Sequence, residues 1–231
     1  MDPVAQSLLT AQRKALFATV VERGMIRPGL TESELSLHIH ELASAEFGLR
    51  RMWHKRIARS GPNTMLTFYD DPPDRRITED DIVYLDFGLV FGDWEADLGR
   101  TYALGADPHK HRLIADIGCA FRQGQRLYQD TPDLSAGALY DFVAGLAQSK
   151  GWEFGAETAG HLVGRFPHER PQKEPRRFSI RHGNATRIRE PDDRGAPRHW
   201  ILEIHFVDRA RQIGGFYEQL LTVDGECVSD G

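Results

Sequence analysis

Residues 82–102 read IVYLDFGLVFGDWEADLGRTY, and this stretch predicts the β-hairpin around which the fold is built. Its first part is almost continuously apolar, as strands covered on both faces are. Gly92 and Asp93 form a tight-turn signal, so we expect a return strand over residues 94–102. A charged residue inside either strand therefore needs a specific explanation.

The two strands carry one such aspartate each, Asp86 and Asp97. Burying a lone carboxylate costs several kcal/mol unless a cation or strong donors compensate it. Paired strands can bring both side chains to one face, where a divalent metal would remove their mutual repulsion. Alternatively, one aspartate caps the turn and the other pairs with Arg100. The hairpin alone leaves both interpretations open.

Two histidines, His161 and His168, lie seven residues apart in the glycine-flanked segment 160–169. Glycines let the backbone approach a site closely. Taken alone, the segment would fit two surface histidines equally well.

Two C-terminal strands, expected over residues 200–207 and 214–223, each hold a glutamate where the pattern predicts core: Glu203 and Glu218. Four buried-looking carboxylates and one imidazole in a single domain are hard to explain by packing. Hard oxygen ligands together with an imidazole suit two divalent ions such as Mn, Co, Zn or Fe. The sequence therefore predicts a two-metal site.

The remaining pattern mixes helices and strands. Helical spacing of apolar residues predicts helices over residues 4–25 and 31–47, and Thr31 with Glu34 forms a capping box for the second. Further elements are helices at 107–129 and 134–149, a strand at 53–60, a loop at 61–80, and strand and loop at 151–168.

Composition points to one ordinary globular domain over residues 1–231, with 40% apolar and 27% charged residues. A net charge of −5 argues against nucleic-acid binding. The sequence shows neither a basic, apolar leader nor a run of about 20 apolar residues, so we expect no export and no membrane partner. Cys119 and Cys227 form no C-x-x-C pair, which fits a reducing cytoplasm.

Residues 165–198 differ from the rest, with ten Lys or Arg against five Asp or Glu. This composition predicts a basic loop excursion within the domain. The excursion is either a functional loop or a mobile, solvated charge run.

Taken in order, these motifs resemble those of the pita-bread metallopeptidases, which include methionine aminopeptidase, aminopeptidase P and prolidase. The family's Asp-x-Gly strand matches residues 86–88, and its S-D-x-x-R-T strand matches residues 96–101. Residues 60–63 resemble the loop before the first metal strand. The resemblance covers residues 5–225, the catalytic domain without the extra N-terminal domain of prolidases. It implies an α+β fold with a curved antiparallel sheet covered by helices.

The resemblance also implies five ligands for two divalent ions: Asp86, Asp97, His161, Glu203 and Glu218. Asp97 and Glu218 would bridge the ions, and a water between them would become the nucleophile. His168, followed by Glu169, would bind the scissile carbonyl. Glu203 would act as general acid and base.

Three positions depart from the family pattern. Phe68 stands where prolidase-like members have a loop histidine, which weakens the expectation of ordinary peptidase activity. Phe216 replaces an arginine common in Xaa-Pro-cleaving members, which weakens the expectation of proline specificity. The usual Glu-Pro-Gly reads Glu203-Ile204-His205.

His205 lies two residues from Glu203 and therefore on the same face of the strand. It is a candidate catalytic residue, as an extra metal ligand or a proton-transfer group. The alternative is a histidine bonded to a backbone carbonyl. His54, in the segment leading to the site, and Phe68 are candidates for substrate contact.

The favoured function is a metal-dependent aminopeptidase or dipeptidase of the Xaa-Pro type, cleaving short peptides. The alternative is a hydrolase or lyase for a small non-peptide amide or amino-acid derivative, as in creatinase-like relatives, which the changes at Phe68 and Phe216 favour. A metal-free binding module is a third interpretation, against which the five retained ligands argue. Because the fold often pairs, a homodimer is a further expectation.

Overall fold

The structure is a computed structural model, and it describes residues 16–168 and 176–222. The helix predicted over residues 4–25 lies partly outside these ranges, and its described part contains α2 (Phe17–Glu22). Within the described ranges, no helix combines the length and the apolar character needed to cross a lipid bilayer.

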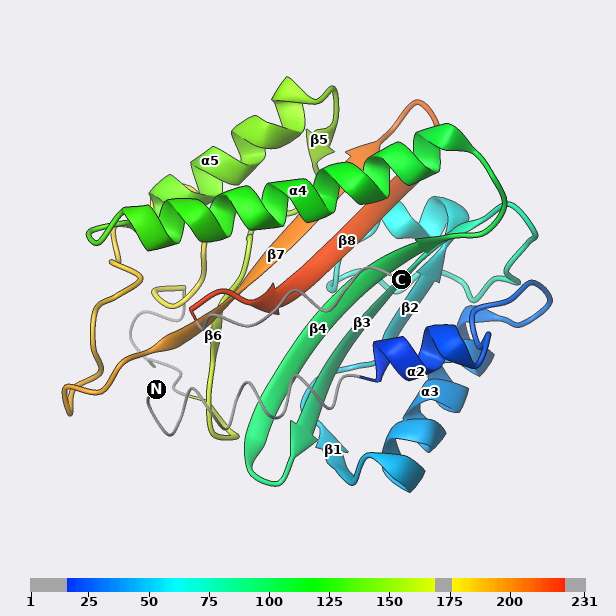
Figure 1. Cartoon of the computed structure of the whole chain (residues 1–231), viewed down its shortest axis with the longest axis horizontal. Coiled ribbons are helices and arrows are strands. Elements are labelled where there is room, and N and C mark those ends of the chain that lie inside the picture. Colours follow the sequence, from blue (N-terminus) through cyan, green and yellow to red (C-terminus); the bar gives the residue numbers. More distant parts are fainter. Residues whose placement is uncertain (1–15, 169–175, 223–231) are drawn as a thin grey trace.

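One sheet of eight strands runs through the molecule, and its paired strands are antiparallel (Figure 1). The strands are β1 (Leu49–Met52), β2 (Ile57–Ser60), β3 (Ile82–Phe91), β4 (Trp94–Ala103), β5 (Glu153–Phe154), β6 (Leu162–Val163), β7 (His199–Asp208) and β8 (Ile213–Leu220). Their order is β1-β3-β4-β8-β7-β5, with β2 pairing β3 and β6 pairing β7. The predicted hairpin and the predicted C-terminal strand pair are therefore confirmed, and they lie side by side.

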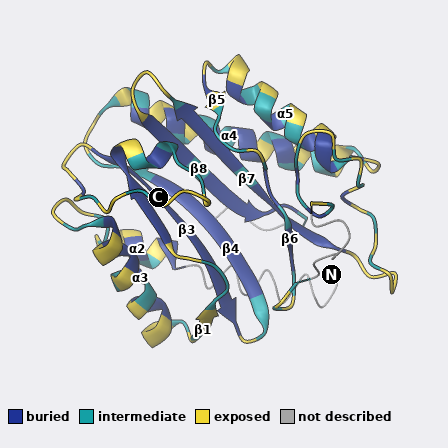
Figure 2. Cartoon of the chain, turned by 180° about the vertical axis from the view of Figure 1, so that it is seen from behind, coloured by how far each residue is buried: buried dark blue, intermediate teal, exposed yellow. Residues whose placement is uncertain are grey.

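Helices cover one face of this sheet (Figure 1). The helices α2 and α3 (Glu32–Glu46) pack over β3 and β4, and α4 (Pro108–Asp130) and α5 (Ala136–Ser149) pack over β7 and β8. The capping box of Thr31 and Glu34 is present at the start of α3. Figure 2 shows the central strands buried along most of their length, whereas the outer sides of the helices are exposed.

Alternate residues of the central strands face opposite sides of the sheet. Leu85 and Phe87 of β3 belong to the core under α2 and α3, and Ile204 of β7 belongs to the core under α4 and α5. Because side chains alternate along a strand, Asp86 and Glu203 point to the side without these helices. We call this side the polar face of the sheet.

The prediction of one strand over residues 53–60 is wrong in its first half. The chain bends at residues 53–56, between β1 and β2. This bend lets His54 leave the edge of the sheet and lie over Gly88 on its polar face. The predicted loop at residues 61–80 contains one short 3-10 helix, Gly61–Met65.

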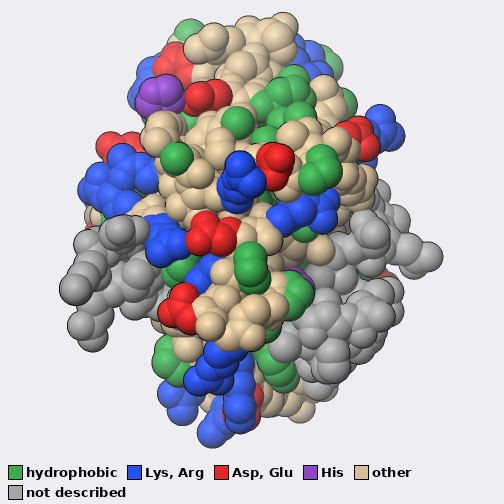
Figure 3. All heavy atoms as spheres, turned by 90° about the vertical axis from the view of Figure 1, so that its left-hand side faces the viewer, with side chains coloured by type: hydrophobic (Ala, Val, Ile, Leu, Met, Phe, Trp, Pro, Cys, Tyr) green, Lys and Arg blue, Asp and Glu red, His purple; other side chains and the backbone are tan. Residues whose placement is uncertain are grey.

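The described part of the basic segment 165–198 packs on the domain through three buried apolar residues: Phe178, Ile180 and Ile188. Arg177 pairs with Glu190 at 2.6 Å, and Arg187 pairs with Asp133 at 2.8 Å. On the face shown in Figure 3, Lys and Arg side chains stand beside Asp and Glu. A wholly solvated charge run does not describe this part, and a functional loop stays a prediction.

Candidate metal centre

Four central strands place carboxylates together on the polar face. In the strand register, Asp86 of β3 lies opposite Gly99 of β4, which in turn lies opposite Glu218 of β8. Glu218 also lies opposite Glu203 of β7. Asp97 stands two residues before Gly99 and therefore points to the same face. We call Asp86, Asp97, Glu203 and Glu218 the carboxylate row.

The glycine at the centre of this row leaves space that a side chain would fill. A Cβ on Gly99 would lie 2.3 Å from Cε1 of Phe216 and 3.1 Å from Cβ of Glu218. The ring of Phe216 also lies 5.4 Å, centroid to centroid, from that of Tyr84. An apolar ring therefore borders the row at the position where the family pattern has arginine.

His161 reaches the row from the segment before β6. Its Nε2 lies 3.3 Å from Oδ2 of Asp97 and 3.7 Å from Oε1 of Glu203. Its Nδ1 lies 2.7 Å from the carbonyl oxygen of Leu162, and a donated hydrogen bond there leaves Nε2 as the ligand atom. All five residues predicted as ligands are thus brought together.

Two carboxylate oxygens in the row suit a cation. Oδ1 of Asp86 and Oε2 of Glu218 are buried and have no hydrogen-bond partner among the residues that the structure describes, which is rare for buried polar atoms. Ligand atoms lie within 4.8 Å of one another in two groups: His54, Asp86 and Asp97, and Asp97, His161 and Glu218. Asp97 belongs to both groups. These donors fit divalent metal ions, which accept oxygen and imidazole ligands.

Without a cation, burial disfavours charge on three carboxylates of the row, whereas His54 and His161 hold the pKa of Asp97 below its usual range despite its burial. Burial raises the pKa of Asp86 and that of Glu203 to about 7, and it raises the pKa of Glu218 well above its usual range. Burial would lower the pKa of His161, but its hydrogen bond to Asp97 and the charge of Glu203 outweigh this and raise the pKa to about 9. The cluster therefore holds protons that a bound ion must displace.

We expect the stabilisation given by added Mn²⁺ to increase as the pH rises from about 6 to about 8. The folded pKa values of Asp86, Glu203 and His161, about 7, 7 and 9, are all raised, so fewer protons remain to be displaced at higher pH. An ion that binds only the folded chain stabilises it according to its affinity. The measurement is the difference in Tm between Mn²⁺-loaded and chelator-treated protein, and a difference independent of pH would contradict the expectation.

Glu95, which sequence reasoning missed, holds His168 beside the row. Its Oε2 lies 2.9 Å from Nδ1 of His168 and accepts a hydrogen bond from the backbone N–H of Gly164 at 3.0 Å. The ring of His168 stacks on that of His161 with centroids 5.7 Å apart. Glu95 is 1% exposed and lies two residues before Asp97, so the alternation of β4 could have identified it.

Glu95→Ala is expected to lower kcat by up to about 10²-fold, because a misplaced catalytic group can cost that much. The reason is that the His168 ring loses the acceptor that fixes its orientation. Glu95→Gln retains an acceptor and should recover most of the loss. Steady-state kinetics and the ion content of each variant are the measurements. A kcat unchanged in Glu95→Ala, with native thermal stability, would show that Glu95 does not position His168.

His205 does not join the row, which corrects the expectation of a further ligand. Its Nε2 lies 2.9 Å from the carbonyl oxygen of Thr64, because the 3-10 helix at Gly61–Met65 packs against this end of β7. Burial lowers the pKa of the His205 imidazole. The backbone-bonded alternative describes this histidine, although it does share the polar face with Glu203.

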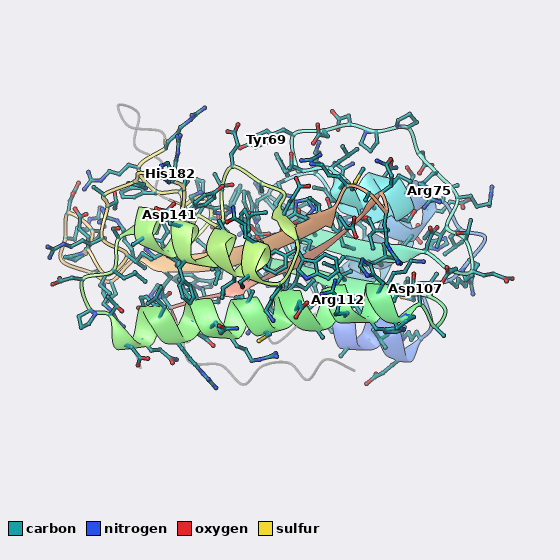
Figure 4. All side chains as sticks on the ribbon, turned by 90° about the horizontal axis from the view of Figure 1, so that it is seen from above. Tyr69, Arg75, Asp107, Arg112, Asp141 and His182 are labelled. Carbon is teal, nitrogen blue, oxygen red and sulfur yellow. The ribbon has the colours of Figure 1, made fainter. Side chains whose placement is uncertain are left out.

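The two residues predicted to contact substrate lie at different depths. The side chain of His54 is 7% exposed and lies against the row. Phe68 is 40% exposed, with its ring 5.4 Å from that of His54. Its neighbour Tyr69 is 84% exposed, and Figure 4 shows it pointing outward on the side of the sheet opposite α4. The contact between Phe68 and substrate stays a prediction, as does the role of Glu169, which lies outside the described residues.

The sheet carries helices on one face and gathers carboxylates and a histidine on the other, and these donors suit divalent metal ions. The chain belongs to metallopeptidase family M24, whose family model matches residues 10–200.

Curated relatives agree with this membership. The Xaa-Pro dipeptidase of Pyrococcus furiosus is 26% identical over 160 residues, which is 69% of this chain and 44% of that protein. The Xaa-Pro dipeptidase of Pyrococcus horikoshii gives the same values. The chain thus spans less than half the length of these curated relatives.

Two solved structures show the same fold. The Xaa-Pro dipeptidase from Bacillus anthracis superposes with a TM-score of 0.75 at 22% identity, covering 97% of this chain and 62% of that one. The prolidase from Pyrococcus horikoshii OT3 gives a TM-score of 0.74 at 20% identity, covering 95% and 59%. The predicted α+β pita-bread fold is therefore confirmed.

Proposed function

We propose that this chain is a hydrolase with two metal ions that acts as an aminopeptidase or dipeptidase on short peptides. The observation that carries the proposal is the carboxylate row with His161, in which buried oxygens of Asp86 and Glu218 have no hydrogen-bond partner among the described residues. The names of the relatives, Xaa-Pro dipeptidases, support a peptide substrate.

The proposed ligands divide between two positions. Asp86 lies at one end of the row, and Glu203 with His161 lies at the other. Asp97 and Glu218 stand between them and are suited to bridging. When bound, two divalent ions would supply Lewis-acid chemistry that lowers the pKa of a bound water. Mn, Co, Zn and Fe all suit this mixture of oxygen and imidazole donors.

Glu203 would transfer the proton, and His168 would contact the scissile carbonyl group. The raised pKa of Glu203, about 7, suits a group that accepts a proton from water and passes it to the leaving amine near neutral pH. Because Nδ1 of His168 is engaged by Glu95, its Nε2 is the nitrogen that would face the scissile carbonyl oxygen. His168 would thereby stabilise the charge developing on that oxygen.

A second candidate function is hydrolysis of a small non-peptide amide or amino-acid derivative. It is favoured by the apolar rings at the positions of two family polar groups, since Phe216 packs over Gly99 and Phe68 lies beside His54. These rings would replace polar contacts to a peptide with apolar ones.

A substrate panel on protein loaded with each of the four metals tests the proposal. It contains Xaa-Pro dipeptides, Met-Xaa peptides and acyl amides without a peptide bond. Cleavage of peptides, abolished by chelator, would support the first function, and cleavage of amides alone would support the second. Metal binding without turnover of any substrate would contradict both and favour a binding module.

A further inference from the structure

His54 occupies a place in the centre that the five-ligand scheme does not use. Its Nε2 lies 3.1 Å from Oδ1 of Asp97 and 3.5 Å from Oδ1 of Asp86. Oδ1 of Asp86 is one of the buried oxygens that have no hydrogen-bond partner within residues 16–168 and 176–222. One imidazole nitrogen therefore points between two carboxylates that are themselves proposed ligands.

The orientation of the His54 ring is that of a histidine ligand. Its Nδ1 lies 2.5 Å from the carbonyl oxygen of Lys55, so a hydrogen bond donated there leaves the lone pair on Nε2 directed at the row. His161 has the same arrangement, with Nδ1 on the carbonyl of Leu162 and Nε2 toward Asp97. Holding one ring nitrogen by a carbonyl is how proteins commonly fix a metal-binding histidine.

The two rings approach Asp97 from different sides. His54 lies against Oδ1 of this carboxylate, and His161 lies against Oδ2. His54, Asp86 and Asp97 form one of the two groups whose ligand atoms lie within 4.8 Å of one another, and His161 belongs to the other. Each imidazole thus faces a different oxygen of Asp97.

Gly88 of β3 leaves space for the ring of His54. A Cβ on Gly88 would lie 2.0 Å from Cδ2 of His54 and 2.5 Å from Nε1 of Trp53, so an L side chain at this position would expel the ring. Trp53 and Phe68 then flank His54 edge-on, with centroids 4.6 Å and 5.4 Å away. The ring is therefore held in place by packing as well as by its hydrogen bond.

We propose that His54 is a sixth protein ligand of the metal pair, on the side of Asp86. The inference rests on the two-metal centre proposed above. His54 and Asp86 would then hold one ion, His161 and Glu203 would hold the other, and Asp97 and Glu218 would contribute to both. An added imidazole makes the Asp86 position more favourable to Co²⁺ and Zn²⁺ than an all-oxygen position would be.

The test is proton NMR of the Co²⁺-loaded protein, together with its cobalt content. An imidazole bound through Nε2 keeps an exchangeable Nδ1–H, which the paramagnetic ion shifts out of the normal spectral range. We expect two such signals and two ions per chain in the unchanged protein. This count needs no variant and does not depend on catalytic activity.

Variants assign the signals. His54→Phe keeps a flat ring between Trp53 and Phe68, and it should remove one signal and weaken binding of one ion by at least about 10-fold. His54→Gln, which keeps a polar side chain, should remove the same signal. His182→Phe is the matched control, because the side chain of His182 is 80% exposed and pairs with Asp141 on the surface (Figure 4). This variant should change neither the number of exchangeable signals nor the number of bound cobalt ions.

The outcomes separate this inference from the proposed function. Two ions with one exchangeable signal, unchanged in His54→Phe, would overturn the sixth ligand and leave the two-metal centre in place. One ion in the unchanged protein and two in His54→Phe would show that the imidazole substitutes for an ion, and would also overturn the inference. Failure to bind any cobalt would contradict the proposed function itself.

Discussion

Asp97→Asn is expected to abolish catalysis and to release both metal ions. Asp97 is 2% exposed, and its two oxygens face the two imidazoles, with Oδ1 near His54 and Oδ2 near His161. Asparagine has almost the same shape but lacks the charge and offers a single carbonyl oxygen. Losing the ions removes several kcal/mol of transition-state stabilisation, so kcat/KM should fall by at least about 10³-fold.

Calorimetric titration with Mn²⁺ and peptide kinetics measure this effect. Asp93→Asn is the matched control, because Asp93 lies in the turn of the same hairpin and pairs on the surface with Arg50 and Arg165. The control should keep native affinity and activity. An Asp97→Asn protein that still binds two ions would show that Asp97 does not bridge them.

Glu203→Gln should lower kcat by about 10²–10⁴-fold at saturating metal, with a much smaller change in KM. Glutamine can still offer an oxygen to a metal ion, but it cannot accept and release the proton that hydrolysis moves. The pKa of Glu203, raised by burial to about 7, is near the value that suits this transfer at neutral pH. The variant therefore separates the proposed proton transfer from the binding of the ions.

The measurement is kcat and KM for the best peptide of the panel, with ion content determined on the same samples. Glu153→Gln is the control, since Glu153 lies on β5 at the edge of the sheet and pairs with Arg209 in solvent. If the Glu203→Gln variant, fully loaded with metal ions, cleaved the peptide at the native rate, another residue would have to transfer the proton. His168 would be the first residue to test.

The central part of the fold could be predicted because charge interrupts strongly apolar strands. Asp86 and Glu203 each sit between apolar residues that face the helices, so strand alternation alone places them on the opposite face. The convergence of β3, β4, β8 and β7 followed from the order of motifs that resembles the family. The register that aligns Asp86, Glu218 and Glu203 is visible only in the sheet.

The sequence indicated His54 as a candidate for substrate contact, but no local pattern predicted that its ring lies against Asp86 and Asp97. Its position depends on a bend at residues 53–56 and on Gly88, a residue of another strand. For His205, the sequence predicted the face of the sheet but not the contact that the ring makes. Alternation gave its face correctly, but the loop carbonyl of Thr64 binds its ring, and that contact comes from a segment far away in the chain.

The most direct test of the account is the number of metal ions per chain, measured by elemental analysis after loading with Mn, Co, Zn or Fe and dialysis. The account predicts about two ions per chain with at least one of these metals, removed by chelator and restored on reloading. No ion above background with any of the four would contradict the metal centre and leave the fold as a binding scaffold.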